Sequence, residues 1–143
     1  MSSHKESKVT DRLFWAKGDK ELYDSLEAQE TFFKNKSRKE QFMFALAFGY
    51  YNQARAGLVN YDGMFNSRDL TPIDISILES IALKVEGDIS VLDEETKIYR
   101  INEEYAHGGI ILLHKQMSKT QIGSYTKKLE VFLTSIYEKN YNP

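Results

Sequence analysis

The stretch that most constrains this chain runs from Ser37 to Gln53 and reads SRKEQFMFALAFGYYNQ. Ser37 and Glu40 have the spacing of a capping box, in which a hydroxyl and a carboxylate bind free backbone N–H groups at the start of a helix. The apolar run from Phe42 to Phe48 then covers almost the whole circumference of a helix, at about 100° per residue. Because a helix that is apolar all round is buried, we expect this helix to form the core of the fold.

Length and composition place the rest of the chain in one water-soluble unit. The 143 residues have the size of a single domain, and the 41% hydrophobic and 28% charged residues are ordinary for a globular protein. Residues 1–10 are polar, so we expect a disordered N-terminal tail followed by a single helical domain over residues 11–143. No apolar run reaches the length of about 20 residues that a bilayer requires, so no membrane partner is predicted.

Other features of the sequence argue against whole classes of function. The chain has no cysteine, which excludes disulfides, thiolate nucleophiles and cysteine-ligated metals, and which fits a reducing compartment. Its net charge of −2 argues against a broad basic surface for nucleic acid. It contains no glycine-rich phosphate loop and no nucleophile elbow. The sequence therefore identifies no catalytic residue and no cofactor, and it favours a non-catalytic protein.

Two further helices are predicted on either side of the central one. The first follows from Asp19, and the second is opened by Thr71 as N-cap with Pro72 at the first helical position. Gly87 is a good terminator for the second helix, and Asp74 is assigned to its polar side. The side chains expected to face the core from these two helices are Leu22, Tyr23, Leu26, Ile73, Ile77, Leu78, Ile81, Ala82 and Val85.

The C-terminal half predicts two more helices. A connector at 88–92 leads to a helix capped by Asp93, and a polar linker at 117–121 leads to a final amphipathic helix over 122–136. Their expected inward side chains are Ile98, Ile101, Tyr105, Leu112, Ile122, Tyr125, Leu129, Phe132, Leu133 and Ile136.

Gly108 and Gly109 fall within the first of these C-terminal helices, on the same face as Tyr105. Two interpretations are open: the helix ends there, or it continues and the glycines let a neighbouring backbone approach closely. Two glycines cost roughly 2 kcal/mol relative to alanine, and the apolar run at 110–113 can supply that free energy. We expect helix on both sides of the pair, with or without a kink.

Residues 58–70 lack a helical period and contain Asp62-Gly63, a type I′ turn signal. This signal predicts a small β-hairpin between Leu58–Asn60 and Met64–Phe65, with a plain connector or a binding loop as the alternatives. The predicted fold class is mainly α: a single compact helical domain of about five helices with one small β-hairpin.

Glu104 and His107 form a Glu-x-x-His pattern, and Glu103 and His114 lie on the same helix. Such spacing places ligands on one face, as in di-iron bundles, but those sites need two such motifs and two more glutamates. Because the chain has one motif, no metal site is predicted, and Glu104, His107 and His114 are only weak candidates. A solvated charged face explains them more simply.

A basic segment precedes and enters the central helix, with Lys34, Lys36, Arg38 and Lys39. Cations at a helix start oppose the macrodipole by about 0.3–1 kcal/mol each. One interpretation is that these cations are simply solvated. The other is an anion site, in which the four cations and the free N–H groups face one phosphate, such as that of the DNA backbone, or one acidic group.

Seven carboxylates make an acidic region in the second half of the chain, offset by Lys97 and Arg100. The interpretations are a solvated rim or a contact surface for a basic partner protein. The carboxylates are Glu86, Asp88, Asp93, Glu94, Glu95, Glu103 and Glu104.

Three segments together resemble a family of small prokaryotic proteins, the dnd system-associated proteins. They are FMFALAFGYYNQAR (42–55), ILESIALKVEGDISVLDEE (77–95) and INEEYAHGGIILL (101–113), and the resemblance covers roughly residues 30–115. The genes of that family lie beside those for DNA phosphorothioation, in which sulfur replaces a non-bridging phosphate oxygen and unmodified DNA is restricted.

The resemblance implies a prokaryotic cytoplasm and a role in restriction–modification and phage defence, and it carries no catalytic residues. The predicted function is that of a non-catalytic accessory protein, which acts through protein partners of a DNA-modification complex and through weak binding to the DNA backbone. A homo-oligomer is compatible with this role. The alternatives are a small DNA-binding module that uses residues 34–39, or a metal-dependent enzyme that uses the Glu-x-x-His pattern.

Overall fold

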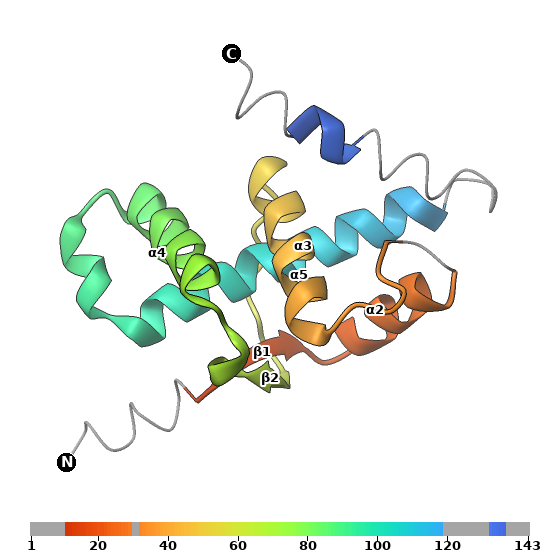
Figure 1. The fold of residues 1–143 in the computed structure, drawn as a ribbon, viewed down its shortest axis with the longest axis horizontal. Helices are drawn as coiled ribbons and strands as arrows, with labels where there is room; N and C mark the ends of the chain where they lie inside the picture. The colour runs from red at the N-terminus through yellow and green to blue at the C-terminus, as the bar shows by residue number, and fades with distance from the viewer. Residues whose placement is uncertain (1–10, 30–31, 119–131, 137–143) are drawn as a thin grey trace.

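The computed structural model describes residues 11–29, 32–118 and 132–136, and it confirms a mainly α fold with one small antiparallel sheet (Figure 1). The described residues contain four long helices, with short 3-10 turns before and after α4, and residues 132–136 form a further helical segment. The elements are β1 (Arg12–Ala16), α2 (Asp19–Ala28), α3 (Arg38–Tyr51), β2 (Tyr61–Asn66), η1 (Ser67–Asp69), α4 (Pro72–Glu86), η2 (Ile89–Asp93) and α5 (Glu95–Ser118).

Helix α3 is the predicted central helix, and it crosses α5 to form the main contact of the fold (Figure 1). The capping box is present, since the Glu40 backbone N–H donates to Ser37 Oγ and the Ser37 N–H donates to the Glu40 carboxylate. Ala47 is exposed, whereas most of the apolar run around it is buried, as expected for a core helix. The buried apolar side chains of α3 are Phe42, Phe44, Ala45, Leu46 and Phe48.

Helix α5 continues without interruption through Gly108 and Gly109, and these glycines meet neighbouring backbone. A Cβ at Gly109 would collide with the carbonyl oxygen of Ala45 in α3, and one at Gly49 would collide with that of Tyr105. The two helices therefore approach so closely that neither crossing point admits a methyl group. The close-approach interpretation of the glycine pair is confirmed.

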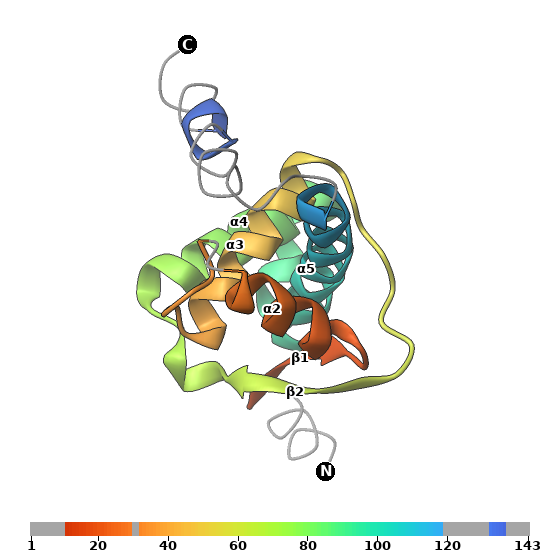
Figure 2. The ribbon, with the colours of Figure 1, turned by 90° about the vertical axis from the view of Figure 1, so that its right-hand side faces the viewer.

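Gly108 faces a different stretch of backbone, the segment between α3 and β2 that runs beside α5 (Figure 2). A Cβ at Gly108 would collide with the carbonyl oxygen of Ala54. Two residues later in this segment, the Ala56 N–H donates to the carbonyl oxygen of Glu104 at 3.1 Å. Adjacent glycines thus admit backbone on two sides of the same helix.

The predicted hairpin between residues 58–60 and 64–65 is wrong. Asp62 and Gly63 lie inside β2, which pairs antiparallel with β1 near the N-terminus, with Phe14 opposite Gly63 and Trp15 opposite Asp62. The turn signal is overridden because β1 brings Leu13 to the core beside the buried end of β2. The long-range pair thus brings Leu13 opposite Phe65, and both side chains are buried.

Helix α4 has the predicted ends, but its inward face is only partly as expected. Thr71 caps the helix and Gly87 adopts a left-handed conformation with φ 71° at its end. Ile73 and Ile77, which were expected inside, are exposed, whereas Asp74, which was expected outside, is buried. The reason is that the Asp74 carboxylate accepts from the Thr71 N–H and binds Lys39 of α3, so the first turn presents this side to the core.

Three boundaries after α4 differ from the prediction. Residues 89–93 form the short helix η2 and not a plain connector, and Asp93 closes η2, while α5 begins at Glu95. Met117 is buried within α5, so the expected linker at 117–121 does not begin there. Val91 in η2 and Met117 in α5 are both buried, which fits helical structure at these two positions.

The expected last helix, 122–136, lies mostly outside the described residues. Within 132–136 the chain is helical, and Phe132 packs against α3. Its ring lies edge-on to Phe48, with centroids 4.4 Å apart, and to Phe44 and Tyr51 at 6.1 and 5.9 Å. Inward-facing Phe132 agrees with the predicted apolar face.

Candidate functional site

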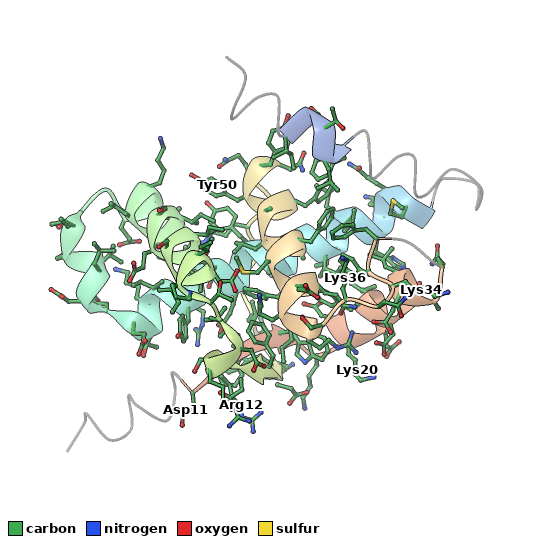
Figure 3. All side chains as sticks on the ribbon, viewed as in Figure 1. Asp11, Arg12, Lys20, Lys34, Lys36 and Tyr50 are labelled. Atoms are coloured by element: carbon green, nitrogen blue, oxygen red, sulfur yellow. The ribbon has the colours of Figure 1, made fainter. Side chains whose placement is uncertain are left out.

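The predicted anion site comprises Lys34, Lys36, Arg38 and Lys39, and the structure separates these cations. Figure 3 shows Lys34 and Lys36 on the segment between α2 and α3, beside α2. The Lys36 ammonium group lies 5.0 Å from the centre of the Phe32 ring, within the range of a cation–π contact. Arg38 and Lys39 belong to the first turn of α3 and point to different helices.

Arg38 binds α2. Its Nη2 atom lies 2.6 Å from Oδ1 of Asp24, its Nη1 atom donates to Gln41 at 2.9 Å, and its guanidinium lies 5.0 Å from the Trp15 ring centre. Hydrogen bonds from Lys20 and from Arg38 hold the pKa of Asp24 below its usual value. The cation at the start of α3 is thus balanced by a carboxylate that is distant in sequence.

Lys39 binds α4. Its ammonium nitrogen lies 2.8 Å from Oδ2 of Asp74, and both side chains are mostly buried. Burial opposes ionisation of Asp74, but the hydrogen bond from Lys39 and those at the Thr71 cap hold its pKa below the usual value. The unfavourable interaction of these two cations with the helix dipole is therefore offset by ion pairs with other helices, which no local sequence pattern reveals.

The candidates of the Glu-x-x-His pattern contact three different residues, one in the segment after α3 and two in α2. Glu104 binds Arg55 at 2.8 Å, and His107 Nδ1 lies 2.8 Å from Oδ2 of the buried Asp19. His114 Nε2 lies 3.3 Å from the hydroxyl of Ser25. Among the residues that the structure describes, no group of three or more histidine, aspartate or glutamate side chains is placed to hold a metal.

Glu103 has a different environment from its neighbour Glu104, since its side chain is only 3% exposed. Its Oε2 atom accepts from the backbone N–H of Phe14 at 2.9 Å, and its Oε1 atom lies 3.5 Å from Nε of Arg100. Burial raises the pKa of Glu103 to about 8, although the hydrogen bond from Phe14 and the charge of Arg100 oppose this rise.

Glu103 lines a cavity of about 100 Å³ between the sheet and α5. Its other walls are Phe14 of β1, Tyr61 of β2, and Thr96, Tyr99 and Arg100 of α5. Sequence reasoning missed this site because it treated Glu103 as part of a solvated charged face. The signal was present: Tyr99, Glu103 and Ile110 follow one helical period, so they share one side of the helix.

Most of the exposed large apolar side chains of the described chain lie in one region, α4 and the adjoining η2. We call this the α4–η2 surface. Ile73 and Ile89 are 73% and 72% exposed, and the remaining members are exposed to a lesser degree. Helix α4 packs on α5 and on η2 through its other side, where Leu78 and Ala82 are buried. The members of the surface are Ile73, Ile75, Ile77, Leu83, Ile89 and Leu92.

The border of the α4–η2 surface is acidic. Lys84 is the one basic residue between positions 73 and 95, and the nearby Lys97 is bound to Glu86 at 2.7 Å. Asp88 is fully exposed, and hydrogen bonds from Ser90 hold its pKa below the usual value, so it stays ionised at neutral pH. The exposed acidic residues of the border are Glu86, Asp88, Asp93, Glu94 and Glu95.

The fold and these features define a small, mainly α protein with an apolar, acid-bordered face. Residues 12–142 match the model of the family DNA sulphur modification system-associated protein 4. Because the match spans nearly the whole chain, the protein belongs to this family, and the resemblance seen in the three sequence segments is confirmed. Comparisons with curated proteins and with solved structures found no match.

The family name places the protein in association with a DNA sulphur modification system. Within the described residues, every helix is either too short or too polar to span a bilayer.

Proposed function

We propose that this protein is a non-catalytic accessory component of a prokaryotic DNA sulphur modification system, and that it holds another protein of that system on its α4–η2 surface. The setting is the one expected from the resemblance: a cytoplasmic restriction–modification system that acts in phage defence. The observation that carries the proposal is the gathering of six exposed isoleucine and leucine side chains on two adjoining elements.

Exposed apolar side chains are common on protein surfaces, but they are usually scattered. Here α4 and η2 supply most of the exposed large apolar side chains of the described chain. Complete burial of one isoleucine contributes roughly 1.5–3 kcal/mol relative to exposure. A partner that covers Ile73 and Ile89 therefore gains a large share of the free energy that a specific complex needs.

The border charges indicate the chemistry of this partner. Exposed acidic side chains lie at the C-terminal end of α4, along η2 and at the start of α5, and Lys84 is the one cation in the sequence from 73 to 95. Complementary charge speeds encounter and rejects wrong partners. The partner face that fits has an apolar centre and a lysine- or arginine-rich border.

The basic segment supports the proposal indirectly. Arg38 and Lys39 are each bound to a carboxylate of another helix, so binding a DNA phosphate requires the loss of an existing ion pair. A strong electrostatic interaction with DNA needs several cations that converge on the backbone. Contacts with a protein partner therefore account for the structure with fewer changes than direct DNA binding.

The test is co-expression of this chain with each of the other proteins encoded by the same DNA sulphur modification gene cluster, followed by co-purification. We expect one of them to bind the wild type, and the double variant Ile73→Asp with Ile89→Asp to lose it. Val59→Asp is the matched control, because Val59 is 83% exposed and lies before β2, outside the α4–η2 surface. Unchanged melting temperatures show that both variants remain folded.

Three outcomes would contradict the proposal. The wild type binds none of these proteins, or the double variant binds as well as the wild type. The third is that the α4–η2 surface joins two copies of this chain, seen as a dimer that the double variant converts to a monomer. A salt titration of duplex DNA affinity tests the alternative function. Strong binding that is lost when Gln replaces Lys34, Lys36, Arg38 and Lys39 would favour a DNA-binding module.

A further inference from the structure

We propose that the cavity beside Glu103 binds an alkylammonium group, such as the end of a lysine side chain. This cavity lies where the bulged pair of strands meets the first turns of α5. The proposal stands independently of the proposed function.

The walls have the composition of a cation site. Phe14 and Tyr61 meet edge to face with ring centres 5.2 Å apart, and Tyr99 closes the cavity from α5. Aromatic faces attract cations through their quadrupole, most strongly where water is excluded. A carboxyl group in the same cavity, that of Glu103, supplies the opposite charge.

The position of Glu103 is fixed by the sheet. The pairing of β1 with β2 shifts between Leu13 and Phe14, and the Phe14 N–H donates to Glu103 Oε2 at this shift. The other oxygen, Oε1, lies 3.5 Å from Nε of Arg100, which is longer than a good charge-assisted hydrogen bond of about 2.7–2.9 Å. Oε1 therefore keeps the capacity to accept a shorter hydrogen bond from a ligand.

The chain's own cation shows that the site accepts positive charge. The Arg100 guanidinium lies 5.3 Å from the centre of the Tyr61 ring, and its side chain is 41% exposed. Arg100 thus rests on one wall of the cavity without closing a tight ion pair with Glu103. An ammonium group can approach Oε1 by the same wall while Arg100 turns outward to water.

The volume limits the class of ligand. About 100 Å³ is far below the roughly 300–1,000 Å³ of sites for drug-sized molecules and cofactors. The cavity accepts the end of one side chain or a small amine, and it excludes a nucleotide.

Charge favours a cation over an anion. The groups that act on Glu103 are Arg100 and Glu104, and Tyr99 feels the charges of Glu95 and Glu103. Among the charged groups that act on these two wall residues, the carboxylates Glu95, Glu103 and Glu104 outnumber the one cation, Arg100. Burial outweighs the hydrogen bond from Phe14 and the charge of Arg100 and so raises the pKa of Glu103, and an ammonium ligand at Oε1 would favour its ionised form.

The test is an NMR titration of the full chain at pH 8 with three probes. Methylammonium and the methylamide of Nα-acetyl-lysine carry the cation, and the methylamide of Nα-acetyl-norleucine is the uncharged match. We expect saturable shifts of the Phe14 amide and of the Tyr61 and Tyr99 rings with the cationic probes alone. Stronger binding of the lysine probe than of methylammonium points to a protein ligand, and the reverse points to a free small amine.

Three variants sharpen the test. Glu103→Gln removes the charge and should weaken binding about ten-fold, the loss expected for a hydrogen bond to a charged group. Glu104→Gln is the matched control, since Glu104 is the adjacent carboxylate, lies outside the cavity and binds Arg55. Arg100→Ala removes the competing cation and should strengthen binding. If Glu103→Gln does not fold, Tyr61→Ala removes a wall at a half-exposed position and should weaken binding.

Equal shifts with the norleucine probe would overturn the proposal, as would unchanged binding in a folded Glu103→Gln or Tyr61→Ala variant. So would saturable binding of inorganic phosphate that is lost in Arg100→Ala, because that result assigns the cavity to an anion.

Discussion

The α3–α5 crossing and the α4–η2 surface are both rich in large apolar side chains, yet one is covered and the other is not. At the crossing, Gly49 and Gly109 bring two backbones together, and Leu46 is fully buried. On α4, Ile73 and Ile77 also lie four residues apart on one side of a helix, but both side chains are exposed. The difference shows that apolar periodicity predicts a helix well, but that the choice of the covered face depends on what packs against it.

Replacing a leucine by aspartate should give the largest difference in stability between the two regions. Leu46→Asp places a carboxylate without a partner in the crossing, at a cost of several kcal/mol against a total stability of about 5–15 kcal/mol. We expect this variant to lose cooperative unfolding in a thermal melt followed by circular dichroism. Leu83→Asp makes the same change on the α4–η2 surface, where the side chain already reaches water, and should alter stability by about 0.5 kcal/mol.

A folded Leu46→Asp variant with an unchanged melting temperature would show that α3 is not the core helix. A Leu83→Asp variant as unstable as Leu46→Asp would show that the α4–η2 surface is covered in the isolated chain.

Added methyl groups should give the next largest contrast. Gly109→Ala places a Cβ against the Ala45 carbonyl oxygen, so we expect a loss of about 1–3 kcal/mol from overpacking. This loss exceeds the gain of about 1 kcal/mol that alanine brings to a helix. Gly57→Ala is the matched control, because a Cβ there meets nothing within 4 Å, and it should be neutral or slightly stabilising. Urea unfolding of both variants measures the contrast, and a stabilised Gly109→Ala would refute the close approach.

Much of the fold follows from local signals, because those signals act within one or two turns. Ser37 with Glu40, and Thr71 with Gly87, mark the ends of α3 and α4 where the structure has them. The short range of these signals also explains why the predicted hairpin is wrong, since the strand that pairs with residues 61–66 lies about fifty residues earlier in the chain. Strand pairing depends on long-range apolar contacts that single-sequence periodicity does not report.

The candidate sites were harder to predict for the same physical reason. From the sequence, Arg38 and Lys39 are cations without a nearby carboxylate, because Asp24 and Asp74, which bind them, lie on other helices. Glu103 reads as solvated because an acidic residue is rarely buried without a partner. The acidic region as a possible surface for a basic partner was visible in sequence, but the exposed isoleucines beside it were assigned to the core.

Buried and exposed acids should give pH dependences of opposite sign. The pKa of Glu103 is about 8 in the folded state, above the usual value of 4.5, so folding retains a proton. Its contribution to stability is complete below pH 4.5 and is lost as the pH rises to about 8, with a slope of at most about 1.4 kcal/mol per pH unit. Asp88 has a lowered pKa, so its contribution is present above its usual pKa of 3.8 and is lost as the pH falls below it.

Melting temperatures between pH 3 and pH 9 test this contrast. The fall from pH 4.5 to pH 8 should be shallower in Glu103→Gln than in the wild type, whereas Asp88→Asn should change only the acid end. Arg100 faces the Glu103 carboxyl and lowers its pKa, so Arg100→Gln should steepen the fall and carry it to higher pH. Parallel curves for Glu103→Gln and the wild type would show that the carboxyl is ionised in the folded protein.

Our main claim is that another protein of the DNA sulphur modification system binds the exposed apolar side chains of α4 and η2. Hydrogen–deuterium exchange of the chain alone and in the co-purified complex tests this claim most directly. The account predicts that residues 72–93 gain the strongest protection in the complex, while the already buried α3–α5 crossing changes little. Protection centred on residues 34–39, with none over 72–93, would contradict it.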